Sequence, residues 1–341
     1  MNFKNGTENS INSTNSSGYW GAQTATIDWC ELNYEVTYYI AEFWNTVSSL
    51  IMVILPIFGI IWYYKFSKMY EKESIQLKTK FSLSISIVWC YLGLMLVGIG
   101  SMMFHMSLLY KYQLLDELPM VLASGILVYA NYSILVSIPR EDNTSFYSKL
   151  FNQKWLVILT ITTYCSAVTY IYVYVNTDPV FHEVCYGVMV TIIIIENILI
   201  MRKLDMPGHL YALQIFYYLF GFFLWNIDNK FCYYLRAYRN ELNVYFDLEH
   251  NKSAFIYMLV VCMRAISELH AFWHLFTGYS TYLSILSLKR AHYHNLVKIE
   301  EFKHSHNETR LNFIDPLESK CFKLYYYLRS LDDFDVIQKN K

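Results

Sequence analysis

The sequence predicts an all-helical membrane protein with seven transmembrane helices. Of its 341 residues, 55% are hydrophobic and only 16% are charged, whereas about a quarter of the residues in soluble domains are charged. Aromatic residues make up 18% of the chain and include 32 tyrosines, and such residues gather where a membrane meets water. Apolar stretches of about 20 residues, the length that crosses a bilayer as a helix, recur along the chain.

These stretches divide the chain into three parts. Residues 1–38 are polar, residues 39–288 hold the spans, and residues 289–341 are a charged tail expected to be soluble and partly disordered. The predicted spans lie at about 39–62, 82–104, 117–137, 155–175, 183–201, 208–228 and 266–288. A further apolar run at 254–264 is too short to span and is expected either to lead into the seventh helix or to lie at the interface. No cleavable signal peptide is expected, because the first 30 residues are polar.

The basic residues of the loops predict the orientation. Lys and Arg gather in the loops at 62–81, 138–154 and 202–207, whereas the loops at 105–116 and 176–182 contain only Lys111. Cytosolic loops carry the excess of basic residues. The loop at 229–265 is a basic exception, but the basic tail outweighs it. The N-terminus, with Asn-x-Ser/Thr sequons at Asn5, Asn12 and Asn15, is therefore expected to be lumenal or extracellular, and the C-terminus cytosolic.

Three histidines are predicted to meet at the outer membrane face. His270 and His274 are four residues apart and share one side of a helix, and His105 ends the second span. The end of the second span and the start of the seventh lie on the same membrane side in this topology. Three protein ligands and one open position are typical of catalytic zinc, which lowers the pKa of bound water towards about 7.

Two oxygen-bearing side chains are expected beside these histidines. Asp116 stands at the start of the third span, where it could handle protons. Ser101 is four residues before His105 and could donate to a developing oxyanion. A single histidine at a helix end is more often interfacial than a metal ligand. A lone His-x-x-x-His pair is about as often a metal site as not. The convergence of all five groups favours a functional site, because ionisable groups in a bilayer are costly.

Other polar residues in apolar surroundings have more than one interpretation. Asp228 is expected either to orient a metal-bound histidine or to play a structural role. His182 is a possible spare ligand, although an interfacial position is preferred, and Glu196 is expected to be buried far from the metal. A nucleic-acid partner is not expected at a net charge of −1.

Seven sequence blocks resemble the alkaline ceramidases, which are seven-helix intramembrane zinc amidases. The blocks are Gly-Tyr-Trp-Gly at 18–21, Asp-Trp-Cys-Glu at 28–31, Ile-Ala-Glu-Phe-Trp-Asn-Thr-Val-Ser at 40–48, Gly-Ser-Met-Met-Phe-His at 100–105, Gln-Leu-Leu-Asp-Glu-Leu-Pro-Met at 113–120, Trp-Asn-Ile-Asp-Asn at 225–229 and His-Ala-Phe-Trp-His at 270–274. The match runs from Gly18 to about Tyr282, with an apparent insertion in the 240–260 region.

The resemblance implies hydrolysis of the ceramide amide to a sphingoid base and a fatty acid. It assigns zinc to His105, His270 and His274, proton transfer to Asp116 and oxyanion stabilisation to Ser101. It also implies a calcium ion on Asp28, the Trp29 carbonyl, Glu31, Asn33 and Glu42, and a disulfide between Cys30 and Cys232. The expected setting is the lipid bilayer of the endoplasmic reticulum or Golgi, with no obligate protein partner.

Three alternatives stay open from the sequence. A receptor of the adiponectin-receptor type, similar in fold, would use the zinc for structure or signalling and would place its N-terminus in the cytosol. A proton or ion transporter would need ionisable residues throughout the membrane depth, whereas here all but Glu196 gather at one face. The same enzyme could also run in reverse and make ceramide.

Overall fold

The described part of the chain is helical. A computed structural model describes residues 18–77, 85–139, 153–246 and 253–307, and within these ranges no strand is formed. The helices are α1 (Phe43–Ser48), α2 (Ile51–Leu77), α3 (Ile85–Ser107), α4 (Tyr110–Ser137), α6 (Lys154–Tyr174), α7 (Pro179–Lys203), α8 (His209–Tyr245), α9 (Ala254–Ile266) and α10 (Leu269–Asn307). The predicted all-helical class is confirmed. The sequons at Asn5, Asn12 and Asn15 and the tail beyond residue 307 lie outside the described residues.

Among the described residues, six helical segments are long and apolar enough to cross a membrane. One consists of α1 together with the first part of α2, and the other five are α3, α4, α6, α7 and α8. A seventh span results if α9 and α10 count as one, although a bend of 61° separates them. The run at 254–264 is therefore a helix of its own, α9, which leads into α10.

Several helix ends differ from the predicted ones. α4 begins at Tyr110, so Asp116 lies inside it rather than at its start. α7 begins at Pro179 because Asp178 caps it, accepting a hydrogen bond from the Val180 N–H at 3.1 Å.

α10 continues to Asn307, well beyond the predicted end at residue 288. Its extension is not a free tail, since Ala291 and Tyr293 are buried and the Lys298 ammonium donates to the Lys203 carbonyl at the end of α7. The predicted end at residue 288 was wrong because the charged residues Lys289 and Arg290 suggested a helix end, although the helix continues and still packs against the bundle beyond them.

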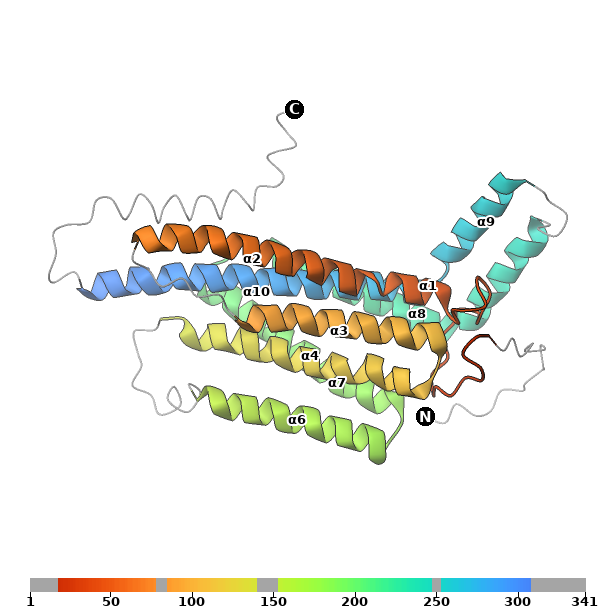
Figure 1. Cartoon of the computed structure of the whole chain (residues 1–341), viewed down its shortest axis with the longest axis horizontal. Coiled ribbons are helices and arrows are strands. Elements are labelled where there is room, and N and C mark those ends of the chain that lie inside the picture. The colour runs from red at the N-terminus through yellow and green to blue at the C-terminus, as the bar shows by residue number, and fades with distance from the viewer. Residues whose placement is uncertain (1–17, 78–84, 140–152, 247–252, 308–341) are drawn as a thin grey trace.

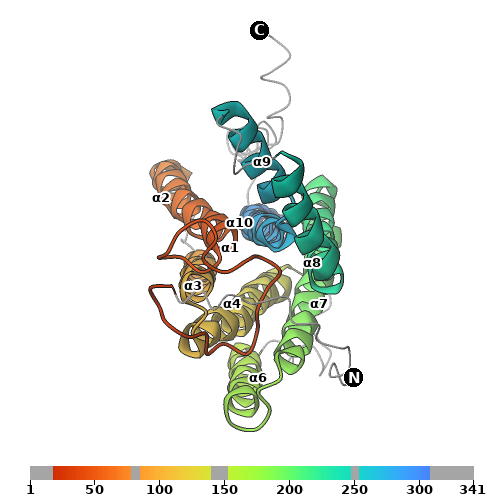
Figure 2. The same cartoon turned by 90° about the vertical axis from the view of Figure 1, so that its right-hand side faces the viewer.

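α10 is the central helix of the bundle. It packs against α2, α3, α4, α7 and α8, and Figure 2 shows it surrounded by them when the bundle is viewed from one end. At that end the N-terminal segment, residues 18–42, lies across the helix ends (Figure 1). Backbone N–H groups of Ala41 and Glu42 donate to the carbonyls of Met106 and His105, both at 2.9 Å, which fixes the segment on the end of α3.

A glycine brings α3 and α4 unusually close where the predicted catalytic residues lie. A Cβ atom at Gly100 would overlap the carbonyl oxygen of Leu115, so only glycine permits this approach. Ser101 follows Gly100 on α3, and Asp116 follows Leu115 on α4. The close crossing therefore sets these two side chains beside the same space.

The last part of α8 and all of α9 leave the bundle together (Figure 1). α8 has a non-helical residue at Phe231, with φ −114° and ψ 17°, and the chain changes direction there. We call residues 231–245 of α8 together with α9 the arm. The arm includes part of the apparent insertion near residues 240–260.

Candidate metal centre

The three predicted histidines meet at the end of the bundle that the N-terminal segment covers. His105 comes from the last turn of α3, and His270 and His274 come from the first two turns of α10. One nitrogen of each ring lies within 4.8 Å of those of the other two. All three side chains are at least 96% buried, with exposures of 1%, 3% and 4%. Two helices distant in sequence thus supply one compact set of nitrogen ligands.

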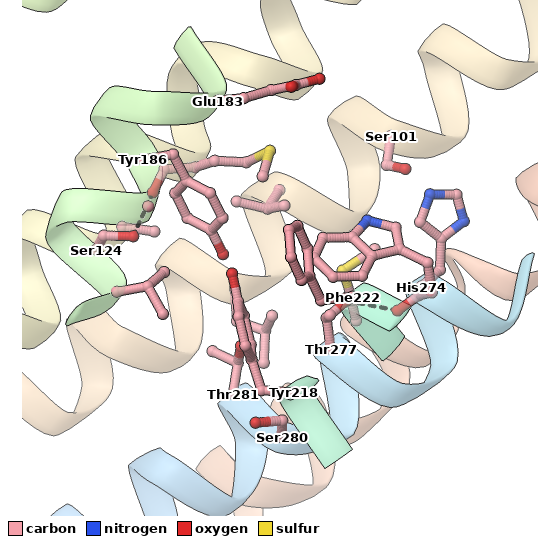
Figure 3. A pocket seen from close by; sticks show the side chains of 18 of the residues that line it. Ser101, Ser124, Glu183, Tyr186, Tyr218, Phe222, His274, Thr277, Ser280 and Thr281 are labelled. Carbon is pink, nitrogen blue, oxygen red and sulfur yellow. Dashed lines mark hydrogen bonds between the residues drawn. The ribbon is translucent and has the colours of Figure 1, made fainter. Parts of the chain in front are cut away.

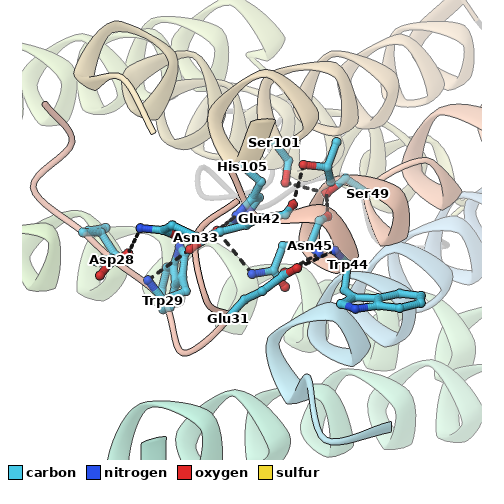
Figure 4. A network of polar contacts seen from close by, with 12 residues as sticks. Asp28, Trp29, Glu31, Asn33, Glu42, Trp44, Asn45, Ser49, Ser101 and His105 are labelled. Carbon is cyan, nitrogen blue, oxygen red and sulfur yellow. Dashed lines mark hydrogen bonds and ion pairs between the residues drawn. The ribbon is translucent and has the colours of Figure 1, made fainter. Parts of the chain in front are cut away.

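Each ring has a contact that fixes its orientation. His105 Nδ1 lies 2.5 Å from a carboxylate oxygen of Glu42 (Figure 4). His274 Nδ1 lies 2.9 Å from the Ser48 hydroxyl and 3.2 Å from that of Ser49. The His270 ring stacks on Trp29, with centroids 3.9 Å apart. Partners of this kind hold metal-binding imidazoles in place.

The remaining ring nitrogens fit a metal ion. His105 Nε2 and His270 Nδ1 are buried and have no hydrogen-bond partner among the described residues, although buried polar atoms are almost always paired. Neutral imidazole nitrogens are good zinc ligands, and three of them leave a fourth tetrahedral position open. The ring geometry and the unpaired nitrogens therefore support a metal site here.

The residues that hold the rings were not predicted from the sequence. Glu42 was assigned to calcium alone, and Ser48 and Ser49 were not singled out. A signal was present in the sequence, because Glu42, Asn45 and Ser49 follow one another at spacings of three and four residues. In the structure, Asn45 donates to Glu42 at 3.2 Å and its carbonyl accepts from the Ser49 hydroxyl at 2.8 Å. This polar stripe on the first span faces the histidines.

Ser101 and Asp116 both line a cavity that begins at the histidines. Its volume is about 400 Å³, and most of its wall is apolar. It extends between α3, α4, α7, α8 and α10 as far as Ser284 and Ile285. Figure 3 shows Ser101 next to His274 at one side of this space and Glu183 at another. The Ser101 hydroxyl also lies 2.8 Å from that of Ser49.

Asp228 holds the backbone at the start of α10. One of its carboxylate oxygens accepts a hydrogen bond from the His270 N–H at 3.3 Å. The other is buried without a hydrogen-bond partner among the described residues. The contact with His270 therefore supports the structural interpretation of Asp228, through the main chain.

The residues assigned to calcium surround the Trp29 turn of the N-terminal segment (Figure 4). Glu31 accepts from the Trp44 and Asn45 N–H groups at the start of α1, at 2.7 and 2.9 Å. The Trp29 carbonyl accepts from Arg236 at 3.0 Å, and the Asn33 amide donates to Asp28 at 3.3 Å. In the described ranges, the histidines form the group with convergent metal-ligand atoms, and these carboxylates do not form a second one.

The same residues nevertheless have the right chemistry for a hard cation. Burial is the largest cause that raises the pKa of Glu31, to about 8, and the nearby Glu42 carboxylate adds to it. Burial also raises the pKa of Asp28, while Asn33 and Arg236 act in the opposite direction. Glu31 and Glu42 are buried, whereas Asp28 is exposed. Neighbouring carboxylates repel one another, and a divalent cation bound by oxygens would offset that repulsion.

Cys30 and Cys232 are joined in a disulfide, with Cα atoms 5.3 Å apart. The bond links the N-terminal segment to the base of the arm. Arg239 reinforces the link, because its buried guanidinium donates to the Cys30 carbonyl and the Ser267 carbonyl, both at 2.8 Å, and pairs with Glu268 at 2.8 Å. The turn that leads into His270 is therefore fastened to the segment that carries Trp29.

Two further polar residues lie outside the metal centre. His182 is 2% exposed and its Nε2 contacts the Glu117 carbonyl at 2.8 Å, so its side chain packs inside the bundle near the start of α7. It is inside α7 because that helix begins earlier than predicted. Glu196 is buried, as expected, and one of its oxygens has no hydrogen-bond partner in the described ranges.

Comparison with known proteins identifies the family. The family model described as Ceramidase matches residues 21–311. The chain belongs to the ceramidase family. It is 37% identical to alkaline ceramidase 3 of Mus musculus over 271 residues, which cover 79% of this chain and 84% of that protein. It is also 32% identical to the putative alkaline ceramidase dcd3A of Dictyostelium discoideum (78% and 86% covered) and 30% identical to alkaline ceramidase YPC1 of Saccharomyces cerevisiae (80% and 78% covered).

The Glu42–His105 contact predicts a specific effect on metal binding by this ceramidase-family protein. We expect Glu42→Gln to weaken zinc affinity by about 10- to 100-fold, the usual effect of removing a partner that orients a ligand. Zinc affinity can be measured by competition with a chelator of known affinity.

Glu31→Gln is the matched control for that experiment. Glu31 is also a buried carboxylate of the calcium set, but it contacts the start of α1 and not a histidine. Zinc affinity should stay near the wild-type value in Glu31→Gln. Equal losses in the two variants would contradict a special role for the Glu42–His105 contact.

Proposed function

We propose that this protein is an alkaline ceramidase that hydrolyses the amide bond of ceramide, with zinc bound by His105, His270 and His274. The observation that carries the proposal is the convergence of these three buried rings at the mouth of a largely apolar cavity. Membership of the ceramidase family supports the reaction, and the names of its relatives specify alkaline ceramidases.

The cavity suits a lipid amide. A chain of the substrate can occupy the apolar space between the helices while the amide lies beside the histidines, so little hydrocarbon is exposed to water. The wall also carries polar groups, among them Ser101 beside His274, Asp116, and Glu183 on another side of the cavity. A pocket with apolar walls and few convergent polar groups is the usual form of a small-molecule site.

Zinc, when bound, would lower the pKa of a water molecule and polarise the amide carbonyl. Asp116 accepts the proton of the attacking water as its oxygen bonds to the carbonyl carbon. The Ser101 hydroxyl donates a hydrogen bond to the carbonyl oxygen as negative charge develops on it. Asp116 then delivers the proton to the amide nitrogen as the carbon–nitrogen bond breaks, which releases an amine and a fatty acid. The same groups serve the reverse reaction.

We also propose that calcium binds Asp28, the Trp29 carbonyl, Glu31, Asn33 and Glu42. The supporting observation is the gathering of three carboxylates, of which Glu31 and Glu42 are buried, in a segment that touches the histidines through Glu42 and Trp29. Calcium would then stabilise the segment that orients the metal centre.

The test of the function is incubation of the purified protein with a panel of ceramides. We expect release of sphingoid base, loss of that activity with a zinc-selective chelator, and recovery when zinc is restored. A calcium-selective chelator should lower the activity while the zinc content stays constant. Absence of hydrolysis for every ceramide by zinc-loaded, folded protein would contradict the proposal.

We place the N-terminus in the lumen of the endoplasmic reticulum or Golgi, because the basic loops favour that orientation. Glycosylation at Asn5, Asn12 or Asn15 in cells tests this. Its absence, together with protection of the C-terminus from cytosolic protease, would favour the adiponectin-receptor orientation instead.

A further inference from the structure

The arm carries an apolar surface that no described part of the protein covers. On α9, one side of the helix is formed by residues spaced three or four apart, and they are Phe255, Met258, Leu259, Cys262 and Ile266, all exposed. Val260, which points the other way, is fully buried. We call these five residues the α9 stripe. A soluble protein rarely exposes a continuous apolar row of this kind without a partner.

Residues 231–245 of α8, the other part of the arm, also expose an apolar side. Phe231, Tyr234, Tyr238 and Tyr245 share one side of the helix and are exposed. Together with Tyr233 and Tyr257, the arm exposes five tyrosines. Tyrosine is enriched at the level of the lipid headgroups, where its ring is in an apolar layer and its hydroxyl reaches water.

The arm also begins at the level where the bundle reaches the membrane surface. α8 runs from His209 to Lys230 before its kink, which is 22 residues and about 33 Å at 1.5 Å per residue. The hydrocarbon core of a bilayer is about 30 Å thick. α8 has therefore just crossed the core when the arm starts.

The direction of the arm matches the membrane plane better than the membrane normal. The axes of α9 and α10 differ by 61°. If α10 crosses the bilayer upright, α9 is only 29° from the membrane plane (90° − 61°). Figure 1 shows the arm leaving one end of the bundle obliquely.

The base of the arm is held firmly, so this direction is a fixed feature. Three kinds of contact join the base of the arm to the N-terminal segment or to the turn before α10. They are the Cys30–Cys232 disulfide, the hydrogen bonds of Arg239 to Cys30 and Ser267, and the ion pair between Arg264 and Glu35. An arm attached at so many points cannot turn its apolar side away by free rotation.

We propose that the arm lies on the bilayer surface at the histidine end of the bundle, with the α9 stripe inserted among the lipid headgroups and upper acyl chains. An amphipathic helix in this position buries its apolar side to a depth of about 5–10 Å. The exposed tyrosines of the arm and its position just beyond a 22-residue crossing of α8 favour lipid over a second protein as the partner. The inference does not depend on the ceramidase activity, only on the bundle crossing a membrane.

Cys262 provides a natural probe, because it is an exposed thiol in the middle of the α9 stripe. A nitroxide spin label on Cys262 would report its surroundings in nanodiscs that hold one copy of the protein, after Cys185 and Cys321 are replaced by serine. Collision rates with oxygen, which enters lipid, and with a water-soluble nickel chelate distinguish the two environments. Two reference labels are made in a Cys262→Ser background. Ile195→Cys, exposed in the middle of α7, is the lipid reference, and Thr177→Cys, in the exposed loop before α7, is the water reference.

We expect the oxygen-to-nickel collision ratio at Cys262 to be several-fold higher than at Thr177→Cys and closer to that at Ile195→Cys. A ratio equal to that at Thr177→Cys would overturn the proposal, because the stripe would then face water. Protection of Cys262 that appears only in discs with two copies would also overturn it, since a second chain would cover the stripe.

Discussion

Ceramide hydrolysis is expected to fall by about 10³-fold or more in His270→Ala. Metal polarisation supplies several kcal/mol of transition-state stabilisation, and about 1.4 kcal/mol corresponds to a tenfold change in rate. The variant removes one of three ring nitrogens that lie within 4.8 Å of one another, and two ligands do not retain zinc well. The measurement is the initial rate of sphingoid-base release, together with the zinc content of the same preparation.

His209→Ala is the matched control. His209 is exposed at the start of α8 and is not among the residues that line the cavity. It should keep full activity and full zinc content, and both variants should elute as wild type does in size-exclusion chromatography. Wild-type activity in folded, zinc-depleted His270→Ala would remove the histidine from the mechanism.

Asp116→Asn is expected to lower the hydrolysis rate by about 10²- to 10⁴-fold, which is the usual contribution of a positioned acid–base group. An asparagine has nearly the same shape but cannot accept and return the proton. Zinc content should be unchanged, because Asp116 is not one of the convergent ligands. His270→Ala and Asp116→Asn are therefore both expected to lose activity, but only His270→Ala is expected to lose zinc.

Glu196→Gln controls for the loss of a carboxylate inside the bundle. Glu196 is buried in α7 and does not line the cavity, so its activity should stay within a few-fold of the wild-type value. An Asp116→Asn protein as active as Glu196→Gln would show that another group transfers the proton.

The histidine site could be predicted from the sequence because its signals are local or topological. The spacing of His270 and His274 defines one side of a helix, and the loop charges bring His105 to the same end of the bundle. The contacts of Glu42, Ser48 and Ser49 with the rings could not be predicted in the same way. They depend on how α1 packs against α3 and α10, which sequence spacing does not specify.

The arm and the end of α10 were also beyond the sequence patterns. The run at 254–264 left two possibilities open, and the 61° bend shows that it forms a separate helix leading into α10. Charged Lys289 and Arg290 suggested an end to the seventh span, yet Ala291 and Tyr293 are buried against the bundle beyond them. Hydropathy describes average polarity, whereas burial depends on which side of each helix the neighbours cover.

The most direct test of this account is the metal content and X-ray absorption spectrum of the purified wild-type protein. We expect about one zinc ion per chain, coordinated by imidazole nitrogens at about 2.0–2.1 Å with one further light ligand. His270→Ala should lose that signal. Active protein that contains no zinc, or zinc whose coordination is unchanged in His270→Ala, would contradict it.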